Sequence, residues 1–255
     1  MEHIYMQFFL TVNEGKWLIA RAVLEMEPVQ RALRSGRVVL KGGTTVSCIS
    51  ELLLDYPLKI SGRMTPEGAM PNRQYTEQAY GILVENGQLR GIDAEVDTLM
   101  PGMGPGDVVI AGANLFDAQG NAAILAGSPG GFRWGRATAA MISEGARVII
   151  PVGLEKLTPG SVTEAMKTAR RQGVQYHDGM ACGLFPLVGD IVTEVEAVRL
   201  LADVEPCVIG RGGIQGAEGG TLFQVHGPAE EVEHLRAVIA LCKGRKIGGD
   251  PASLL

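Results

Sequence analysis

The chain has 255 residues, of which 46% are hydrophobic and 20% charged, so it can bury the core of an ordinary globular protein. Its formal net charge of −5, without any basic run, argues against nucleic-acid partners. The N-terminus lacks the pattern of a signal peptide, and no apolar run approaches the ~20 residues of a membrane span. We therefore expect a cytoplasmic protein that has no membrane partner.

The first part of the chain predicts a strand, a broken helix and a strand–turn–helix unit. Residues 3–12 alternate loosely, as in a strand, and residues 14–35 follow a helical pattern that breaks near Pro28. A β-branched strand at 37–40 then enters the turn Lys41-Gly42-Gly43-Thr44-Thr45, and a helix follows to residue 54. This unit is the most informative stretch of the chain.

The turn between that strand and that helix is the first candidate site. A helix N-terminus presents free backbone N–H groups, which favour a phosphate or a carboxylate. Lys41 would add a positive charge, and Thr44 and Thr45 would add hydroxyl donors. The predicted anion-binding residues here are Lys41, Gly42, Gly43, Thr44 and Thr45. The plainer interpretation is a tight turn without a ligand.

The middle of the chain predicts an α/β fold. Residues 59–72 are expected to form a loop, and Asn86-Gly87 predicts a hairpin. Apolar runs at 107–110 and 146–152 predict buried parallel strands, with a helix at 136–144 between them. This alternation predicts a mostly parallel, Rossmann-like sheet with helices on both faces.

The last part of the chain predicts a smaller α+β unit. Strands are expected around a glycine-rich loop at 211–220, and helices are expected at 162–172, 193–201 and 230–241. We therefore divide the chain into an α/β anion-binding domain (1–157), a smaller α+β subdomain (158–247) and a tail (248–255). The N-terminal aromatic residues Tyr5, Phe8 and Phe9, together with the last helix, predict contacts with a second copy and so a homo-oligomer.

Four motifs over about residues 37–157 together resemble one superfamily. In order, they are Leu40-Lys41-Gly42-Gly43-Thr44-Thr45, Gly112-Ala113-Asn114 followed by Asp117 and Gly120-Asn121, the glycine-rich segment 127–131, and a strand running into Glu155-Lys156-Leu157. This order resembles the fold shared by ribose-5-phosphate isomerase, glucosamine-6-phosphate deaminase and the CoA-transferases. The resemblance implies a ligand crevice at the carboxyl ends of the parallel strands.

The departures from that superfamily weaken any inference about activity. Its isomerases carry acidic residues after the later strand, where this chain has Ala111, Asn114 and Leu115 and keeps only Asp117. The lysine of the isomerases is also missing near Ala126, and no motif places the glutamate that the CoA-transferases need. The resemblance therefore implies architecture without settling whether the protein is an enzyme.

Several further residues are candidates, each with a plainer alternative. Asp117 and Glu155 are the candidate proton-transfer groups, although Asp117 could shape a turn and Glu155 could pair with Lys156. The further candidate ligand-binding residues are Asn114, Gly130, Gly131 and Arg133, and Arg63 is a weaker candidate. The roles of Tyr176-His177-Asp178 and Cys182 stay open, and no histidine or cysteine spacing predicts a metal site.

The expected function is binding of a small phosphorylated or carboxylated metabolite in the crevice. If the protein is an enzyme, isomerisation, hydrolysis or group transfer would fit. The alternatives are a non-catalytic metabolite sensor or assembly subunit on the same fold, and a binder of an acyl-CoA or folate-type ligand. The sequence leaves the cofactor unknown.

Overall fold

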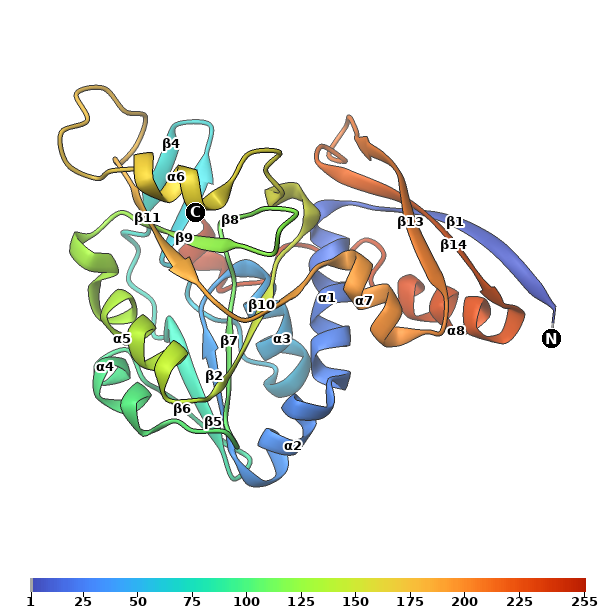
Figure 1. The fold of residues 1–255 in the computed structure, drawn as a ribbon, viewed down its shortest axis with the longest axis horizontal. Coiled ribbons are helices and arrows are strands. Elements are labelled where there is room, and N and C mark those ends of the chain that lie inside the picture. The colour runs from blue at the N-terminus through green and yellow to red at the C-terminus, as the bar shows by residue number, and fades with distance from the viewer. Residues whose placement is uncertain (1) are drawn as a thin grey trace.

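The structure is a computed structural model that describes residues 2–255. A six-stranded sheet flanked by helices forms its main body, and a three-stranded sheet projects to one side (Figure 1). The α/β class is therefore confirmed. In the described part of the chain, no helix is both long and apolar enough to cross a membrane.

The central sheet is mixed. Its strand order is β12 (Asp190–Val192), β10 (Arg147–Pro151), β7 (Val108–Ala111), β2 (Arg37–Lys41), β5 (Gly81–Glu85), β6 (Gln88–Gly91). The first four strands pair in parallel, whereas β5 is antiparallel to both β2 and β6. Asn86 and Gly87 both have positive φ in the β5–β6 turn, so the predicted hairpin is confirmed.

Helices cover both faces of this sheet (Figure 1). On one face lie α1 (Val12–Glu25), α2 (Glu27–Ser35) and α3 (Thr44–Leu54), and on the other lie α4 (Val96–Leu99) and α5 (Phe132–Ser143). The middle strands are buried on both sides, which explains their continuous apolar runs. The predicted helix break falls at Met26, so Pro28 lies in the first turn of α2, where proline is tolerated.

The projecting sheet joins the two ends of the chain. Its order is β1 (His3–Leu10), β14 (Gly220–Pro228), β13 (Glu205–Gly212), and α7 (Glu194–Leu201) and α8 (Ala229–Ala240) pack against it. Strand pairing crosses the expected boundary at residue 157 three times among the described residues, because β1 pairs with β14, β10 with β12, and β9 (Ala122–Ala126) with β11 (Gly183–Leu187). The division of the chain into domains stays a prediction.

Smaller elements lie above the carboxyl ends of the parallel strands (Figure 1). They are the hairpin β3 (Gly62–Thr65) and β4 (Gly68–Pro71), the sheet β8 (Leu115–Phe116), β9 (Ala122–Ala126), β11 (Gly183–Leu187), and the helix α6 (Val162–Thr168). The prediction of a loop over 59–72 is therefore wrong. The hairpin is held by a distant segment, because Met180 donates its N–H to the Ala69 carbonyl.

The last eight residues and the N-terminal aromatic residues also have defined places. Residues 248–255 lie against the main body, where Gly249 donates its N–H to Glu51 and Ser253 accepts one from Ile60. Of the three aromatic residues that suggested an oligomer, Phe8 stacks on Phe223 inside the protein, whereas Tyr5 is 68% exposed. The homo-oligomer stays a prediction.

Candidate functional site

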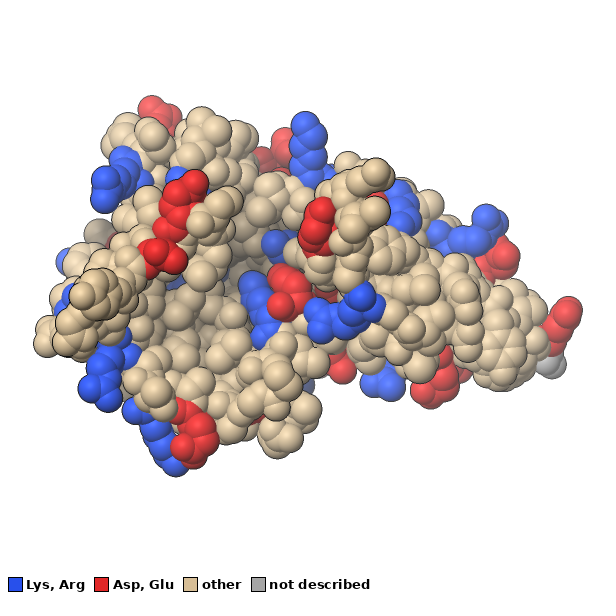
Figure 2. Space-filling model, turned by 90° about the horizontal axis from the view of Figure 1, so that it is seen from above, with Lys and Arg blue, Asp and Glu red and all other residues tan. Residues whose placement is uncertain are grey.

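A cavity of about 560 Å³ lies at the carboxyl ends of β2 and β7. The turn after β2 and residues 112–114 after β7 form its base, and residues 60–66 and the Ile124–Leu125 stretch of β9 form its sides. Figure 2, which views the molecule from this end, shows a hollow that has basic side chains inside it. The predicted crevice therefore exists as a built cavity.

The cavity wall is strongly cationic. Its charged lining residues are Lys16, Lys41, Arg63 and Lys156, and no aspartate or glutamate among residues 2–255 lines it. A concave surface lined by one sign of charge concentrates ligands of the opposite sign. The wall therefore favours an anion although the chain as a whole is acidic.

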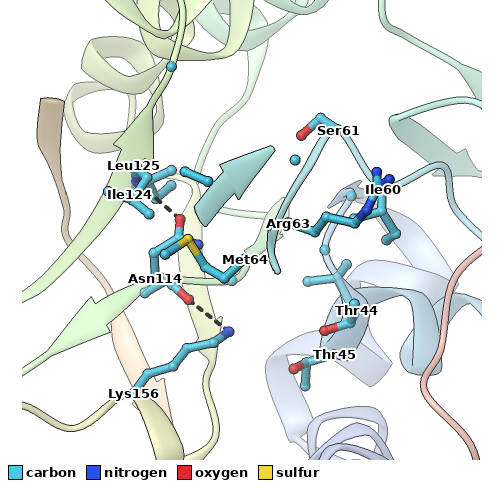
Figure 3. A pocket seen from close by; sticks show the side chains of 18 of the residues that line it. Thr44, Thr45, Ile60, Ser61, Arg63, Met64, Asn114, Ile124, Leu125 and Lys156 are labelled. Atoms are coloured by element: carbon cyan, nitrogen blue, oxygen red, sulfur yellow. Dashed lines mark hydrogen bonds between the residues drawn. The ribbon is translucent and has the colours of Figure 1, made fainter. Parts of the chain in front are cut away.

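The N-terminus of α3 opens into this cavity. Gly43 is its N-cap residue, and no side chain among the described residues caps the helix. Thr45 is 3% exposed, yet its hydroxyl has no hydrogen-bond partner within the described part of the chain. The Thr44 and Thr45 hydroxyl groups face the side of the cavity on which Asn114 and Lys156 lie (Figure 3). An anion here would satisfy both the helix terminus and a buried hydroxyl.

Gly42 fits the turn because it lacks a side chain. A Cβ at this position would collide with the carbonyl oxygen atoms of Tyr80 and Lys59. The Gly42 N–H also donates to the carbonyl of Tyr80, the residue before β5, which ties the turn to this neighbouring segment. The glycine therefore lets the turn lie tightly against its neighbours while Gly43 and Thr44 border the cavity.

Lys41 is a cation that has no acidic partner among residues 2–255. Burial lowers the pKa of its amine to about 8. Its Nζ lies 5.8 Å from the centre of the Trp134 ring, and no carboxylate among the described residues forms an ion pair with it. A buried cation that lacks a counter-charge is costly, so this position is favourable for a bound anion.

Lys156 lies on the opposite wall, backed by two glutamates. It ends the 3₁₀ turn η3 (Leu154–Lys156), and its Nζ donates to the Ala113 carbonyl at 3.1 Å (Figure 3). Burial lowers the pKa of Lys156, opposed by the charges of Glu155 and Glu194 and reinforced by that of Lys16. Here, unlike at Lys41, nearby carboxylates offset part of the positive charge.

Glu194 is the more deeply buried of these two acids. It is 4% exposed, and its Oε2 accepts the Leu154 N–H at 2.9 Å. Burial, with a smaller contribution from the Glu155 charge, raises the pKa of Glu194 to about 7. One oxygen of Glu155 is also buried, and it has no hydrogen-bond partner among residues 2–255. A carboxyl group that is partly protonated near neutral pH, that of Glu194, therefore lies behind the cavity wall.

The structure brings together six of the predicted site residues and leaves the others elsewhere. Lys41, Gly42, Gly43, Thr44, Thr45 and Asn114 all line the cavity. Glu155 lies behind the wall, beside Lys156. Arg133 instead forms an ion pair with Asp97 at 2.8 Å, and Gly130 and Gly131 form a left-handed turn before α5. These last three residues do not line the cavity of the described structure.

Asp117, the other candidate proton-transfer group, is engaged by the loop around it. Its carboxylate accepts N–H groups from Gln119, Asn121 and Val162, and the Asn121 amide donates to both of its oxygen atoms. Burial would raise the pKa of Asp117, but these hydrogen bonds lower it overall. Asp117 does not line the cavity among the described residues. Its contacts are those of the turn-forming alternative.

We expect Asp117→Ala to destabilise the fold by about 2 kcal/mol, because it leaves the buried Val162 N–H and two partly buried loop N–H groups without their acceptor. Urea unfolding at pH 7 measures this loss of stability. The affinity of the folded variant for phosphate should differ little from that of wild type. The wild-type carboxylate should also lose its stabilising contribution as the pH falls below about 4, since its pKa is lowered in the folded state. A variant that is as stable as wild type but no longer binds phosphate would contradict this structural role.

Sequence reasoning missed Lys16 and undervalued Lys156. In the sequence, Lys156 stands out only as the neighbour of Glu155, and Arg63 is only a weaker candidate in a predicted loop. Lys16 lies within α1 and reaches the cavity because α1 packs against α3. No pattern in the sequence around Lys16 indicates that this residue reaches the cavity. Lys156, by contrast, follows the strand at 147–151, and ligands commonly bind at such strand ends.

The described residues assemble neither an activated thiol nor a metal centre at the cavity. Cys182 lines it, but burial raises the pKa of this thiol, which disfavours the reactive thiolate. His177 is exposed, and its Nδ1 lies 3.0 Å from the Gly179 carbonyl oxygen. Residues 2–255 contain no cluster of three or more side chains able to hold a metal ion.

Comparison with known proteins adds no further constraint. The chain matches no protein-family model, no curated protein and no solved structure. Its function must therefore be argued from the cavity itself.

Proposed function

We propose that the protein binds a small metabolite through a phosphate or carboxylate group held at the N-terminus of α3. The observation that carries this proposal is Lys41, a cavity-lining lysine without a carboxylate partner among residues 2–255, next to a helix terminus without a side-chain cap. The unpartnered Thr45 hydroxyl supplies an additional donor. An anion would supply a counter-charge to Lys41 and would accept hydrogen bonds from the N-terminus of α3 and from the Thr45 hydroxyl.

The size of the cavity favours a small ligand over an extended one. Its volume of about 560 Å³ lies within the usual range for small-molecule sites. An acyl-CoA, with its nucleotide and its pantetheine arm, would have to extend beyond it. A sugar phosphate or a phosphorylated or short carboxylic acid is the better match.

Replacement of Thr45 tests the anion subsite. Thr45→Val keeps the shape of the side chain and removes only the hydroxyl, so we expect inorganic phosphate to bind about tenfold more weakly. Isothermal titration at pH 7 measures the affinity. Thr168→Val is the matched control, because Thr168 is exposed and its hydroxyl donates to the Glu164 carbonyl of its own helix. Equal affinities in Thr45→Val and wild type would refute the assignment of this subsite.

We also propose that the protein belongs to the superfamily of the isomerases, the deaminase and the CoA-transferases. The support for this proposal is the set of parallel neighbours β2, β7, β10 and β12 and the cavity at their carboxyl ends. On such a fold the protein is either an enzyme or a metabolite sensor. Chemical change of a bound metabolite during incubation would rule out the sensor, and recovery of the unchanged metabolite would favour it.

A further inference from the structure

The wall opposite α3 carries a group that anion binding alone does not require. Lys156 presents its Nζ at the cavity, fixed by the hydrogen bond to the Ala113 carbonyl (Figure 3). The Thr44 and Thr45 hydroxyl groups lie across the open space from it. A ligand held by α3 would therefore present its other end to this amine.

The surroundings of Lys156 lower the pKa of its amine and so raise the fraction that is neutral. Burial has the largest effect and disfavours the charged form, and the nearby positive charge of Lys16 acts in the same direction. Glu155 and Glu194 oppose this effect without cancelling it. Desolvation and a neighbouring cation are the two conditions that convert a lysine into a nucleophile.

We infer that Lys156 condenses with the aldehyde or ketone group of a metabolite whose anionic group is held at α3. This inference rests on the proposed function, and it narrows the ligand class to phosphorylated or carboxylated carbonyl compounds. The Nζ lone pair forms a bond to the carbonyl carbon, and a proton moves from this nitrogen to the carbonyl oxygen to give a neutral carbinolamine. A second proton, from an acid, adds to the hydroxyl group, which leaves as water while the C=N bond forms. The products are a protonated imine, water and the conjugate base of that acid, and no redox partner is needed.

Two features of the wall suit this condensation. Loss of water needs a proton donor, and Glu194, whose charge acts on Lys156 and whose pKa burial raises to about 7, can hold that proton near neutral pH behind the wall. Beside Lys156, the Asn114 Oδ1 accepts the Leu125 N–H, and this bond orients the Asn114 amide on the cavity wall. The amide N–H₂ can then donate to a carbonyl oxygen.

The first test measures the reactivity of the amine without any ligand. Limited reductive methylation with formaldehyde and cyanoborohydride at pH 7, followed by peptide mapping, compares Lys156 with Lys167, which is 66% exposed. We expect about tenfold more methylation at Lys156, and inorganic phosphate should suppress it. Methylation of Lys167 without any at Lys156, in protein that still binds phosphate, would overturn the inference. If Lys156 is methylated preferentially but phosphate does not change the yield, the result would support a reactive Lys156 amine and count against the proposed function.

The second test uses a carbonyl compound that carries a phosphate group. Glyceraldehyde 3-phosphate with cyanoborohydride should give one main adduct, on Lys156, absent from Lys156→Arg and retained in Lys167→Arg. Thr45→Val should lower its yield about tenfold at limiting probe concentration, because the phosphate is held less tightly. Adducts that merely follow the exposure of the lysines in wild type would overturn the inference.

Discussion

Lys41→Met should make the protein more stable at pH 7 and deprive it of phosphate binding. The folded state lowers the pKa of Lys41 from 10.5 to about 8, so keeping this amine protonated at pH 7 costs up to about 3 kcal/mol. Methionine has a similar length and fills the same space without a charge. Phosphate affinity should fall about a hundredfold, since a charge-assisted contact is lost.

The dependence on pH makes this result specific to Lys41. Between about pH 8 and pH 10.5 the unfolded chain binds more protons at this residue than the folded one, so wild-type stability rises with pH. The advantage of Lys41→Met should therefore be largest below pH 8 and shrink toward pH 10.5. Urea unfolding across this range measures it, and Lys167→Met serves as an exposed control. A Lys41→Met protein that is less stable than wild type at pH 7 would show that Lys41 is not an uncompensated cation.

The features that could be predicted from the sequence are those set by neighbouring residues. The strand, glycine turn and helix around Lys41–Thr45 follow from a β-branched run, two glycines and a helical period, and Asn86-Gly87 carries its own turn geometry. Five of the six predicted residues that line the cavity lie within this one local unit. Asn114 followed from its position after a buried strand.

The features that could not be predicted depend on distant contacts. The β3–β4 hairpin lacks an alternating apolar pattern and is held by residues 179–180. Strand β1 pairs with β14, more than 200 residues away along the chain. Asp117 and Arg133 have the residue types of a site, but neighbouring N–H groups and Asp97 already engage them. Only the fold reveals which polar side chains keep their capacity for a ligand.

We expect wild-type stability to fall as the pH rises from about 4.5 to about 7, and Glu194→Gln should abolish this fall. The folded state raises the pKa of Glu194 from 4.5 to about 7, so in this interval it binds more protons than the unfolded chain. Wild-type stability should therefore fall by up to about 3 kcal/mol as the pH rises through this range. Glutamine can still accept the Leu154 N–H through its carbonyl oxygen, and it carries no charge that burial would penalise.

Urea unfolding of wild type and Glu194→Gln at pH 4.5 and pH 8 measures this effect, with the exposed Glu205→Gln as the control. Equal slopes of stability against pH in the two proteins would contradict the assignment.

The same substitution should tighten phosphate binding at pH 8, because it removes a negative charge from behind Lys156. In wild type, protonation of Glu194 below about pH 7 and of Lys41 below about pH 8 both make the cavity more positive. Affinity for an anion should therefore rise toward acidic pH, as long as the anion itself keeps its charge.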